Sequence, residues 1–431
     1  MFEKYDAYKD SYIQGIKLIP EKWKVIKLKY LLDSKAGFAF PSDAFSDSGT
    51  AVVRISDLLV SGVVDISKSP KLPSKFNKYL SEYFAEEGNI LMAMTGGTIG
   101  KVSIYKYEQK SFLNQRVCKF IPKANFYPKL AWYWMNTDVW KDYIDLKAFG
   151  GAQPNISDNT IKEMQICLPD SLDTQISICN FLDKKTYEIE QVIAIKEQQI
   201  ALLNERKQIV IQKAVTQGLD PNVPMKDSGV EWVAQIPEKW KLMRLKFLLS
   251  EINVRSETGD ETLLSLSKYK GVIPKDALDE RAGSASTLVG YKKVFKDNLV
   301  INKMQAVNGL LAVSELEGIT SPDYSVYSAK DNSVSINYIT FLLNQPEYLA
   351  EMKKRVTGVM EGFIRLYTDD LFDIKVLLPS YAEQLKIVQY INTVIKQVEE
   401  ATSNLVQQIE KLKEYKTTLI NDAVTGKIKV A

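Results

Sequence analysis

The sequence predicts an α+β protein built as a tandem repeat. Two mixed α/β domains are expected, separated by two long antiparallel helices that pair as a coiled coil. Three observations predict this fold: an entry segment occurs twice, a long helical pattern occurs twice, and the stretches between them mix strand and helix patterns. A chain of 431 residues also exceeds what one ordinary core organises. The predicted boundaries are 1–167 for the first domain with its entry segment, 168–220 for the central long-helix region, 221–377 for the second domain and 378–431 for the distal long-helix region.

The entry segment shows the duplication most directly. The sequence IPEKWK at Ile19–Lys24 recurs 217 residues later at Ile236–Lys241. The same offset relates Lys9–Ser11 to Lys226–Ser228, which both read KDS. A shared frame of this kind does not arise by chance, so the chain is a tandem duplication.

Each half then continues with short strands, turns and helical stretches. In the first half, Gly88–Met94 is typical of a buried strand that leads into a turn, and its counterpart is Asp297–Gly309 at an offset of 209. Helical patterns follow at 127–144 and 336–356. The two halves match well at entry segments and long helices and poorly between them. Each half is therefore expected to be a shared frame that holds a divergent globular insert.

The long helices are predicted from an uninterrupted period. No Gly or Pro occurs from Ser171 to Gln217. Within this range mostly apolar residues recur at alternating spacings of four and three, which places them on one side of a helix. Because the pattern occurs twice, each helix is the expected partner of the other, the alternative being homodimerisation through one helix. Lysines within this seam are expected to fix its register at a cost in stability. The seam positions are Ile189, Ile193, Lys196, Ile200, Leu203, Lys207, Val210 and Ala214, and then Val398, Thr402, Leu405, Ile409, Leu412, Lys416, Leu419 and Ala423.

Composition narrows the class of protein. The chain is 45% hydrophobic and 25% charged, and it has no run of 18 apolar residues and no secretory signal pattern, so a cytoplasmic protein is expected. Cys118, Cys167 and Cys179 have no paired spacing and are expected to be reduced, structural thiols. Histidine is absent, which excludes Ser-His-Asp, Cys-His and His-based metal chemistry, while catalysis by carboxylates or lysine stays open.

Positive charge is concentrated locally although the net charge is only +3. Residues 91–130 carry seven basic side chains against one acid, and residues 281–305 carry five against one. Basic clusters at related places in two halves favour phosphate binding over a merely solvated surface. The basic residues are Lys101, Lys106, Lys110, Arg116, Lys119, Lys123 and Lys129, and then Arg281, Lys292, Lys293, Lys296 and Lys303.

Motifs for three kinds of catalyst are incomplete. Thr95–Lys101 (TGGTIGK) resembles a phosphate-binding loop, but Val102 stands where Ser or Thr is needed, and a strand pattern follows instead of a helix. A turn whose backbone approaches a DNA phosphate, or a plain tight turn, fits better. Asp220–Val223 lacks the second proline and the aromatic residue of an adenine methyltransferase motif. The nuclease-like pair of Asp323 with Glu351–Lys353 falls in a helical pattern.

Polar residues at predicted loop tips are the candidates for reading DNA base edges. Arg and Lys can pair with guanine acceptors, and Asn and Gln match adenine. The candidates are Thr98, Lys101, Gln115, Arg116, Gln153 and Asn155 in the first insert, and Lys303, Gln305, Asn308, Arg365 and Tyr367 in the second.

Taken together, these features resemble the specificity (S) subunit of Type I restriction–modification systems, the HsdS family, over essentially the whole chain. The second insert departs from the family pattern because it lacks the Gly-Gly-Thr turn and the Asn-Gln-Arg triplet. The resemblance is carried by the entry segments, by Gly37–Phe40, Asn89–Lys101, Asn114–Val117 and Gly150–Ile156, by Gln175 and Gln384 at the helix starts, and by Ala214–Gly218 and Ala423–Gly426 at the helix ends.

The resemblance implies a subunit without catalytic activity that serves in defence against foreign DNA. Two target recognition domains would each bind one half of a bipartite, asymmetric double-stranded DNA sequence. Methyltransferase (M) and restriction (R) subunits would be the partners, and S-adenosylmethionine, ATP and Mg²⁺ would be used by them. This subunit would carry no cofactor or metal.

Two other functions are left open by the residues. One is an S-like subunit of a related restriction or defence system with its own or a fused nuclease or methyltransferase activity. The other is a coiled-coil assembly protein that does not bind DNA. If the chain is a specificity subunit, the long helices set the distance between its two recognition domains. About 45 helical residues span on the order of 65 Å. That length suits half-sites about one DNA turn apart.

Overall fold

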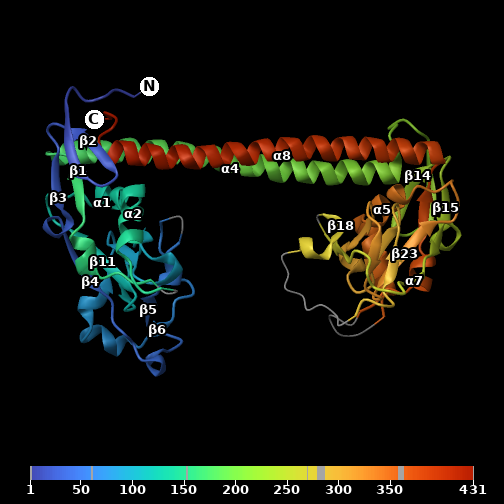
Figure 1. Cartoon of the computed structure of the whole chain (residues 1–431), viewed down its shortest axis with the longest axis horizontal. Coiled ribbons are helices and arrows are strands. Elements are labelled where there is room, and N and C mark those ends of the chain that lie inside the picture. Colours follow the sequence, from blue (N-terminus) through green and yellow to red (C-terminus); the bar gives the residue numbers. More distant parts are fainter. Residues whose placement is uncertain are drawn as a thin grey trace. The chain divides into compact units, whose positions relative to one another are not determined.

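A computed structural model describes residues 2–59, 62–151, 154–268, 270–278, 287–357 and 364–430. The chain divides into two compact units (Figure 1). The first unit comprises Met1–Glu197 and Val406–Ala431, and the second comprises Gln198–Leu405. Each unit therefore contains one globular portion and a part of each long helix, which confirms the predicted α+β class and the tandem arrangement.

The first unit is built on an antiparallel sheet in the order β4 (Leu32–Ala36), β11 (Val117–Pro122), β8 (Ile90–Ala93) and β9 (Val102–Ile104). A second sheet, whose pair β5–β10 is parallel, has the order β6 (Lys71–Leu72), β5 (Thr50–Val53), β10 (Ser111–Leu113) and β7 (Phe84–Ala85). Two further pairs are β1 (Tyr8–Ile13) with β2 (Ile16–Pro20), and β3 (Lys24–Lys27) with β12 (Gln165–Leu168). The short helices are α1 (Pro128–Trp134), α2 (Asp138–Lys147) and α3 (Asp158–Lys162).

The second unit repeats this plan. Its central antiparallel sheet has the order β16 (Leu249–Glu251), β23 (Tyr324–Ala329), β20 (Leu299–Asn302) and β21 (Leu311–Val313). The other pairs are β13 (Met225–Val230) with β14 (Val233–Pro237), β15 (Lys241–Arg244) with β24 (Lys375–Leu378), β17 (Leu264–Ser267) with β18 (Gly271–Pro274), and β19 (Lys292–Val294) with β22 (Gly318–Thr320). The short helices are α5 (Ile336–Leu343), α6 (Pro346–Arg355) and α7 (Thr368–Phe372).

The duplication extends further into the inserts than sequence similarity indicates. The hairpin, the second strand pair, the central sheet order and the three following short helices recur in the same chain order. The two units differ at the periphery, where the β6-β5-β10-β7 sheet has no counterpart of the same order among the described residues of the second unit. The inserts are therefore one fold with different outer strands.

Backbone detail confirms the offset of 209 in the central sheets. Asn89 and Asn298 each accept a hydrogen bond at Oδ1 from a backbone N–H three residues earlier, at 3.0 and 2.9 Å. The residue before each asparagine has a positive φ, which is 83° at Gly88 and 64° at Asp297. The same turn thus precedes β8 and β20, although glycine is replaced by aspartate, one of the residues that tolerate this conformation.

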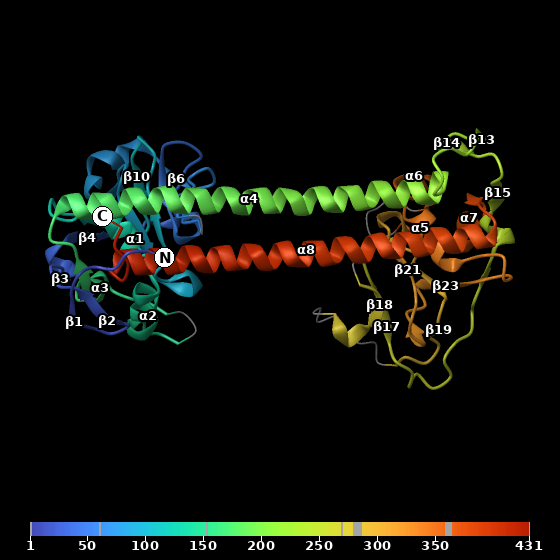
Figure 2. The same cartoon turned by 90° about the horizontal axis from the view of Figure 1, so that it is seen from above.

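The long helices α4 (Leu172–Gln217) and α8 (Tyr381–Val424) run antiparallel and side by side (Figures 1 and 2). In the first unit, Lys416 forms an ion pair with Glu190 at 2.6 Å, and Lys196 donates to Gln408 Oε1 at 2.6 Å. All sixteen predicted seam residues are buried or half-buried. The seam and the pairing of the two helices within one chain are confirmed, and two of its three lysines, Lys196 and Lys416, have polar partners.

A buried glutamine joins each globular portion to the start of a long helix. Gln175 Oε1 accepts from the Tyr127 backbone N–H at 2.9 Å, just before α1. Gln384 Oε1 accepts from the Ser335 N–H at 2.8 Å, just before α5, and its Nε2 donates to the Ser333 carbonyl oxygen. These glutamines are 2% and 0% exposed. Such a fully bonded amide fixes the loop to the helix with a specific geometry.

The entry segments hold the opposite helix ends. Trp23 and Trp240 are both 2% exposed and belong to the cores of their units. A Cβ on Gly426, just after α8, would meet the Trp23 ring at 3.2 Å, and one on Gly218, just after α4, would meet the Trp240 ring at 3.4 Å. Each entry tryptophan thus packs on the glycine that ends a long helix. Over the part of the chain that the structure describes, no helix is long and apolar enough to cross a membrane.

Candidate nucleic-acid interface

Three loops of the first unit meet where strand β8 ends. The Ile156 N–H donates to the Met94 carbonyl oxygen at 3.1 Å, and the Gly96 N–H donates to the Pro154 carbonyl oxygen at 2.9 Å. The Met94 N–H donates in turn to the Arg116 carbonyl oxygen at 2.9 Å. Backbone hydrogen bonds therefore tie the turn after β8, the β10–β11 turn and the segment before α3 into one surface.

Five of the six residues predicted for the first insert lie on these loops. Thr98 lies in the 3₁₀ turn Gly96–Thr98 and is exposed, and Lys101 follows it half-buried. Gln115 and Arg116 are exposed on the β10–β11 turn, and Asn155 is exposed on the third loop. Gln153 lies outside the described residues. The structure thus brings together side chains that are up to 57 positions apart in the sequence.

The turn after β8 depends on Gly100. Its φ is 79°, and a Cβ there would lie 2.9 Å from the Ile144 side chain of α2. The Gly100 carbonyl oxygen accepts a hydrogen bond from Trp140 Nε1 at 3.0 Å. The glycine therefore lets the turn rest directly on α2, and this contact holds Thr98 and Lys101 in place.

The second unit has an equivalent surface at the end of β20. The Leu366 N–H donates to the Lys303 carbonyl oxygen at 3.0 Å, as Ile156 does to Met94 in the first unit. Gln305 and Asn308 are exposed around the 3₁₀ turn after β20, and Asn308 Nδ2 donates to Gln305 Oε1 at 2.7 Å. The other predicted residues are half-buried Arg365 and Lys303, and Tyr367, which is 48% exposed.

Charged groups surround Lys303 in this surface. Burial lowers the pKa of Lys303, and nearby Lys292 lowers it further. Arg365 forms an ion pair with Asp323 at 3.4 Å. Lys303 thus lies beside two ion pairs, Lys292–Glu251 and Arg365–Asp323, and itself has no ion pair among the described residues.

Sequence reasoning missed two members of the second surface, Asp323 and Tyr324. They lie 209 residues after Asn114 and Gln115, so the repeat itself carried the signal. Both line a cleft of about 330 Å³ together with Asn302 and Met304. Among the described residues, the Ser325 hydroxyl beside them is buried without a hydrogen-bond partner, and so is the Thr95 hydroxyl at the first surface. Unpartnered polar atoms at both places suit a polar ligand.

The predicted basic clusters are smaller than residue counting suggests. Lys119 is 9% exposed and donates to the Phe84 carbonyl oxygen, and Lys292 is 3% exposed beside Glu251. Others are neutralised by acids: Lys110 by Glu86, Lys123 by Asp33, Lys129 by Asp183 and Lys293 by Glu261.

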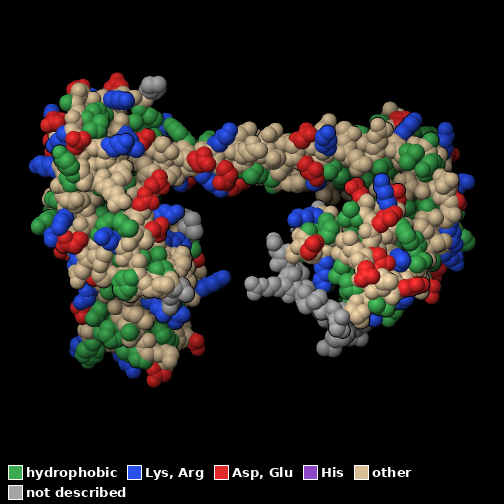
Figure 3. Space-filling view, in the orientation of Figure 1, with side chains coloured by type: hydrophobic (Ala, Val, Ile, Leu, Met, Phe, Trp, Pro, Cys, Tyr) green, Lys and Arg blue, Asp and Glu red, His purple; other side chains and the backbone are tan. Residues whose placement is uncertain are grey.

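Of the counted cations, Lys101, Lys106, Arg116, Lys296 and Lys303 have no ion pair among the described residues, and Arg281 lies outside them. Figure 3 shows basic and acidic side chains interspersed over the visible face of each unit. The free cations at the two surfaces are therefore Lys101 and Arg116 in the first unit and Lys303 in the second.

The described residues offer no group of three or more His, Cys, Asp or Glu that could hold a metal ion. Burial raises the pKa of Cys118, Cys167 and Cys179 to about 12, so these thiols remain protonated near neutral pH. Glu351, part of the nuclease-like pair, lies on α6 and pairs with Arg355. What the two surfaces offer is hydrogen bonding and positive charge.

The known proteins to which this chain is similar are Type I restriction–modification specificity subunits. Residues 20–203 match the model of a Type I restriction modification DNA specificity domain. The chain is 22% identical to the Type I restriction enzyme MjaVIII specificity subunit of Methanocaldococcus jannaschii over 100% of this chain and 97% of that protein. It is 22% identical to the EcoBI specificity subunit of Escherichia coli over 92% of this chain and 86% of that protein.

Two solved structures share the fold. A chain from a study of complex assembly and conformational transition of the type I R-M system aligns with a TM-score of 0.70 and 15% identity, covering 95% of this chain and 99% of its own length. The HsdS subunit from Thermoanaerobacter tengcongensis aligns with a TM-score of 0.57 and 15% identity, covering 96% and 100%. Each likeness extends over both units.

Proposed function

We propose a mechanism by which this chain selects DNA. The premise is its family: the chain belongs to the specificity (S) subunits of Type I restriction–modification systems. Each unit reads one half of a bipartite, asymmetric target in double-stranded DNA. The observation that carries this proposal is the repetition of one loop surface, at the end of β8 and at the end of β20, with different side chains in the two copies.

Affinity and sequence choice come from different groups in this scheme. Lys101, Arg116 and Lys303 supply salt-dependent attraction to phosphates or pair with guanine. Asn155 and the Gln305–Asn308 pair offer amides that match adenine, while Asp323 can accept a hydrogen bond from the cytosine amino group. Because the first surface carries Gln115 and Arg116 where the second carries Tyr324 and Ser325, the two half-sites differ.

The chain acts as a reader and a scaffold in this proposal, without a catalytic site of its own. Methyltransferase (M) subunits dock on it and use S-adenosylmethionine, and restriction (R) subunits join with ATP and Mg²⁺. The match of residues 20–203 to a DNA specificity domain supports this division of tasks.

The test is a binding assay with the purified complex of this chain and its M subunit. The target is first found by sequencing methylated DNA from a host that expresses both. The complex is expected to bind a duplex with both half-sites far more tightly than a duplex in which either half is scrambled. Equal affinity for all duplexes contradicts the proposal. Turnover by the chain alone with DNA, Mg²⁺ and S-adenosylmethionine contradicts the scaffold role.

Arg116→Ala tests, in the same assay, which half-site the first unit reads. The loss of one bidentate base contact is expected to cost about 1–3 kcal/mol on the half-site read by the first unit and to relax its sequence preference. Lys106→Ala, which removes a cation of the first unit outside the loop surface, is the matched control and should leave the base preference unchanged. A changed preference at the other half-site would show that Arg116 is assigned to the wrong half.

A further inference from the structure

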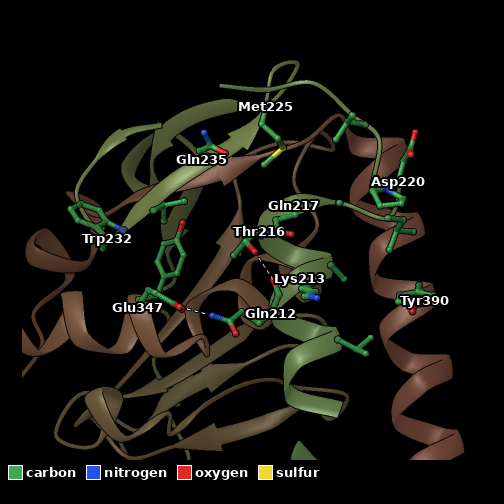
Figure 4. A pocket seen from close by; sticks show the side chains of 18 residues that line it. Gln212, Lys213, Thr216, Gln217, Asp220, Met225, Trp232, Gln235, Glu347 and Tyr390 are labelled. Carbon is green, nitrogen blue, oxygen red and sulfur yellow. Dashed lines mark hydrogen bonds between the residues drawn. The ribbon is translucent and has the colours of Figure 1, made fainter. Parts of the chain in front are cut away.

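The second unit contains a large pocket at the end of α4, with a volume of about 960 Å³ (Figure 4). It is bounded by the last turns of α4, the segment 218–223 that leads to β13, the β13–β14 hairpin, the start of α6 and Tyr390 of α8. This pocket lies away from the loop surface at the end of β20. No candidate DNA-binding residue lines it.

The first unit has polypeptide at the corresponding place. Phe181 occupies the position 209 residues before Tyr390, and the Phe2 ring packs edge-on against it with centroids 5.5 Å apart. Tyr5 packs against Trp23 at 5.9 Å, and Ile428 and Val430 pack on the same core. In the first unit two chain segments, 2–5 and 428–430, thus lie at this place, whereas in the second unit the single continuous segment 218–223 takes the place of both.

The second unit leaves the corresponding side chains uncovered. Tyr390 is 44% exposed and makes no aromatic contact with the described residues, and Leu219 is 42% exposed. Figure 4 shows Tyr390 on α8 and Lys213 on α4. Lys213 has no ion pair among the described residues, whereas Asp422, its counterpart 209 residues later, pairs with Lys427 at 3.2 Å.

The pocket also contains polar atoms without partners. Trp232 Nε1 is buried and has no hydrogen-bond partner among the described residues. Glu347 accepts a hydrogen bond from Gln212 at one carboxylate oxygen, while the other oxygen is buried and unpaired. Buried groups of this kind are costly unless a ligand satisfies them.

We propose that this pocket binds an extended segment of a partner polypeptide that carries an aromatic side chain. The aromatic ring packs on Tyr390 as Phe2 packs on Phe181, and an acidic group of the segment pairs with Lys213. Backbone groups of the segment satisfy Trp232 and Glu347. The occupant is a polypeptide because the first unit has two polypeptide segments at this place, with Phe2 on Phe181, where the second unit has one. The proposal does not depend on DNA recognition.

The probe is a synthetic peptide with the sequence of residues 1–8 (MFEKYDAY), labelled at its C-terminus and titrated with the full chain by fluorescence anisotropy. Saturable binding is expected. Tyr390→Ala should weaken it by about tenfold, the effect of losing one aromatic pair with its buried area. Tyr415→Ala is the matched control, because Tyr415 is a similarly exposed tyrosine of α8, 47% exposed, outside the pocket. It should bind as tightly as the parent.

A second variant tests whether the weaker peptide binding could come from misfolding. Glu347→Gln keeps the shape of the pocket and is expected to weaken the peptide several-fold while the circular dichroism spectrum stays unchanged. A peptide with both Phe2 and Tyr5 replaced by alanine should not bind. The proposal is overturned by absent or non-saturable binding, by equal binding to the Tyr390→Ala chain, or by loss in Phe181→Ala alone. The last result would mean that the peptide exchanges with the chain's own segment in the first unit.

Discussion

Single ion pairs show how closely the two units repeat one another. Glu163, at the end of α3, accepts hydrogen bonds from Lys27 at 2.6 Å and Lys29 at 2.8 Å. In the second unit, Asp373 lies at the corresponding position after α7, with Arg244 at 3.5 Å and Lys246 at 3.9 Å. The same triad therefore fastens the last short helix to the strand after the entry segment, with tighter geometry in the first unit.

This triad makes the stability of the first unit depend on pH. The bonds from Lys27 and Lys29 lower the pKa of Glu163 from 4.5 to about 2. A carboxyl group with a lowered pKa stabilises the folded state above its unfolded pKa and loses that effect as pH falls. Glu163→Gln is therefore expected to lower Tm at pH 7 by on the order of 1–2 °C. The difference from the parent should shrink between pH 4.5 and 2.

Thermal unfolding followed by circular dichroism across this pH range checks the prediction. Asp373→Asn, which loosens the wider triad, is the control and should have a smaller effect at pH 7. A difference between Glu163→Gln and the parent that stays constant down to pH 2 would show that the carboxylate charge is not what stabilises the contact.

At the residue scale, sequence reasoning found the loop surfaces but misjudged the charges. Thr98, Arg116 and Asn155 could be found because polar residues at turns are exposed and loops carry function. Lys119 and Lys292 could not be excluded from the basic clusters, because the sequence does not tell which lysine inserts beneath an outer sheet. Asp323 was missed because it was considered only as part of a nuclease-like pair and not as a candidate for a base contact.

At the scale of elements, the ends of the long helices are as distinctive as their seams. Gly426 and Gly218 follow the two helices with φ of 75° and 82°. A Cβ on Gly426 would overlap the Pro20 ring, whereas one on Gly218 would meet Glu383 and Trp240 only at 3.4 Å. The two ends thus share a conformation but differ in the space around it.

Alanine at Gly218 and at Gly426 is expected to distinguish the cost of backbone strain from the cost of steric overlap. Gly218→Ala should cost about 1 kcal/mol of unfolding free energy, because a side chain in the left-handed region is strained. Gly426→Ala should cost about 2–4 kcal/mol, because overlap with Pro20 is added. Urea unfolding of the two variants checks this order. Equal destabilisation would mean that the entry segment moves aside without cost.

Helices and strands were predicted more accurately where their apolar residues recur with a clear period. The long helices were predicted almost to their bounds because 46 and 44 residues pass without a helix breaker. The recurrence of the central sheet was underestimated, because strand positions accept many apolar residues and leave little sequence identity behind. The short 3₁₀ turns after β8 and β20 follow from tertiary contacts such as Trp140 on Gly100.

At the scale of the whole molecule, the two units share both long helices. Residues 172–197 of α4 belong to the first unit and residues 198–217 to the second, and α8 is divided in the same way between 405 and 406. We propose that the length of these helices sets the tolerated spacing between the two half-sites. The open pocket in the second unit, by contrast, could not be predicted, because it depends on how the segment 218–223 and the β13–β14 hairpin pack.

Lengthening both helices tests the proposal about spacing. Seven residues inserted after Ile200 and seven after Asn404 keep the seam in register and add about 10 Å of helix. The preferred spacer is then expected to grow by about three base pairs, at 3.4 Å per base pair, with both half-sites unchanged. Binding selection from a library of spacers measures this. An unaltered spacer would show that the helices do not determine the spacing.

The buried glutamines at the two helix starts have a consequence for inheritance. Gln175 and Gln384 join their globular portions to the long helices through the same kind of bonds, and the entry segments before those portions are nearly identical. Recombination between the repeated stretches of the gene can therefore replace one globular portion with another while both joints still close. A new DNA preference would then arise in one genetic step, without the gradual alteration of an existing reader.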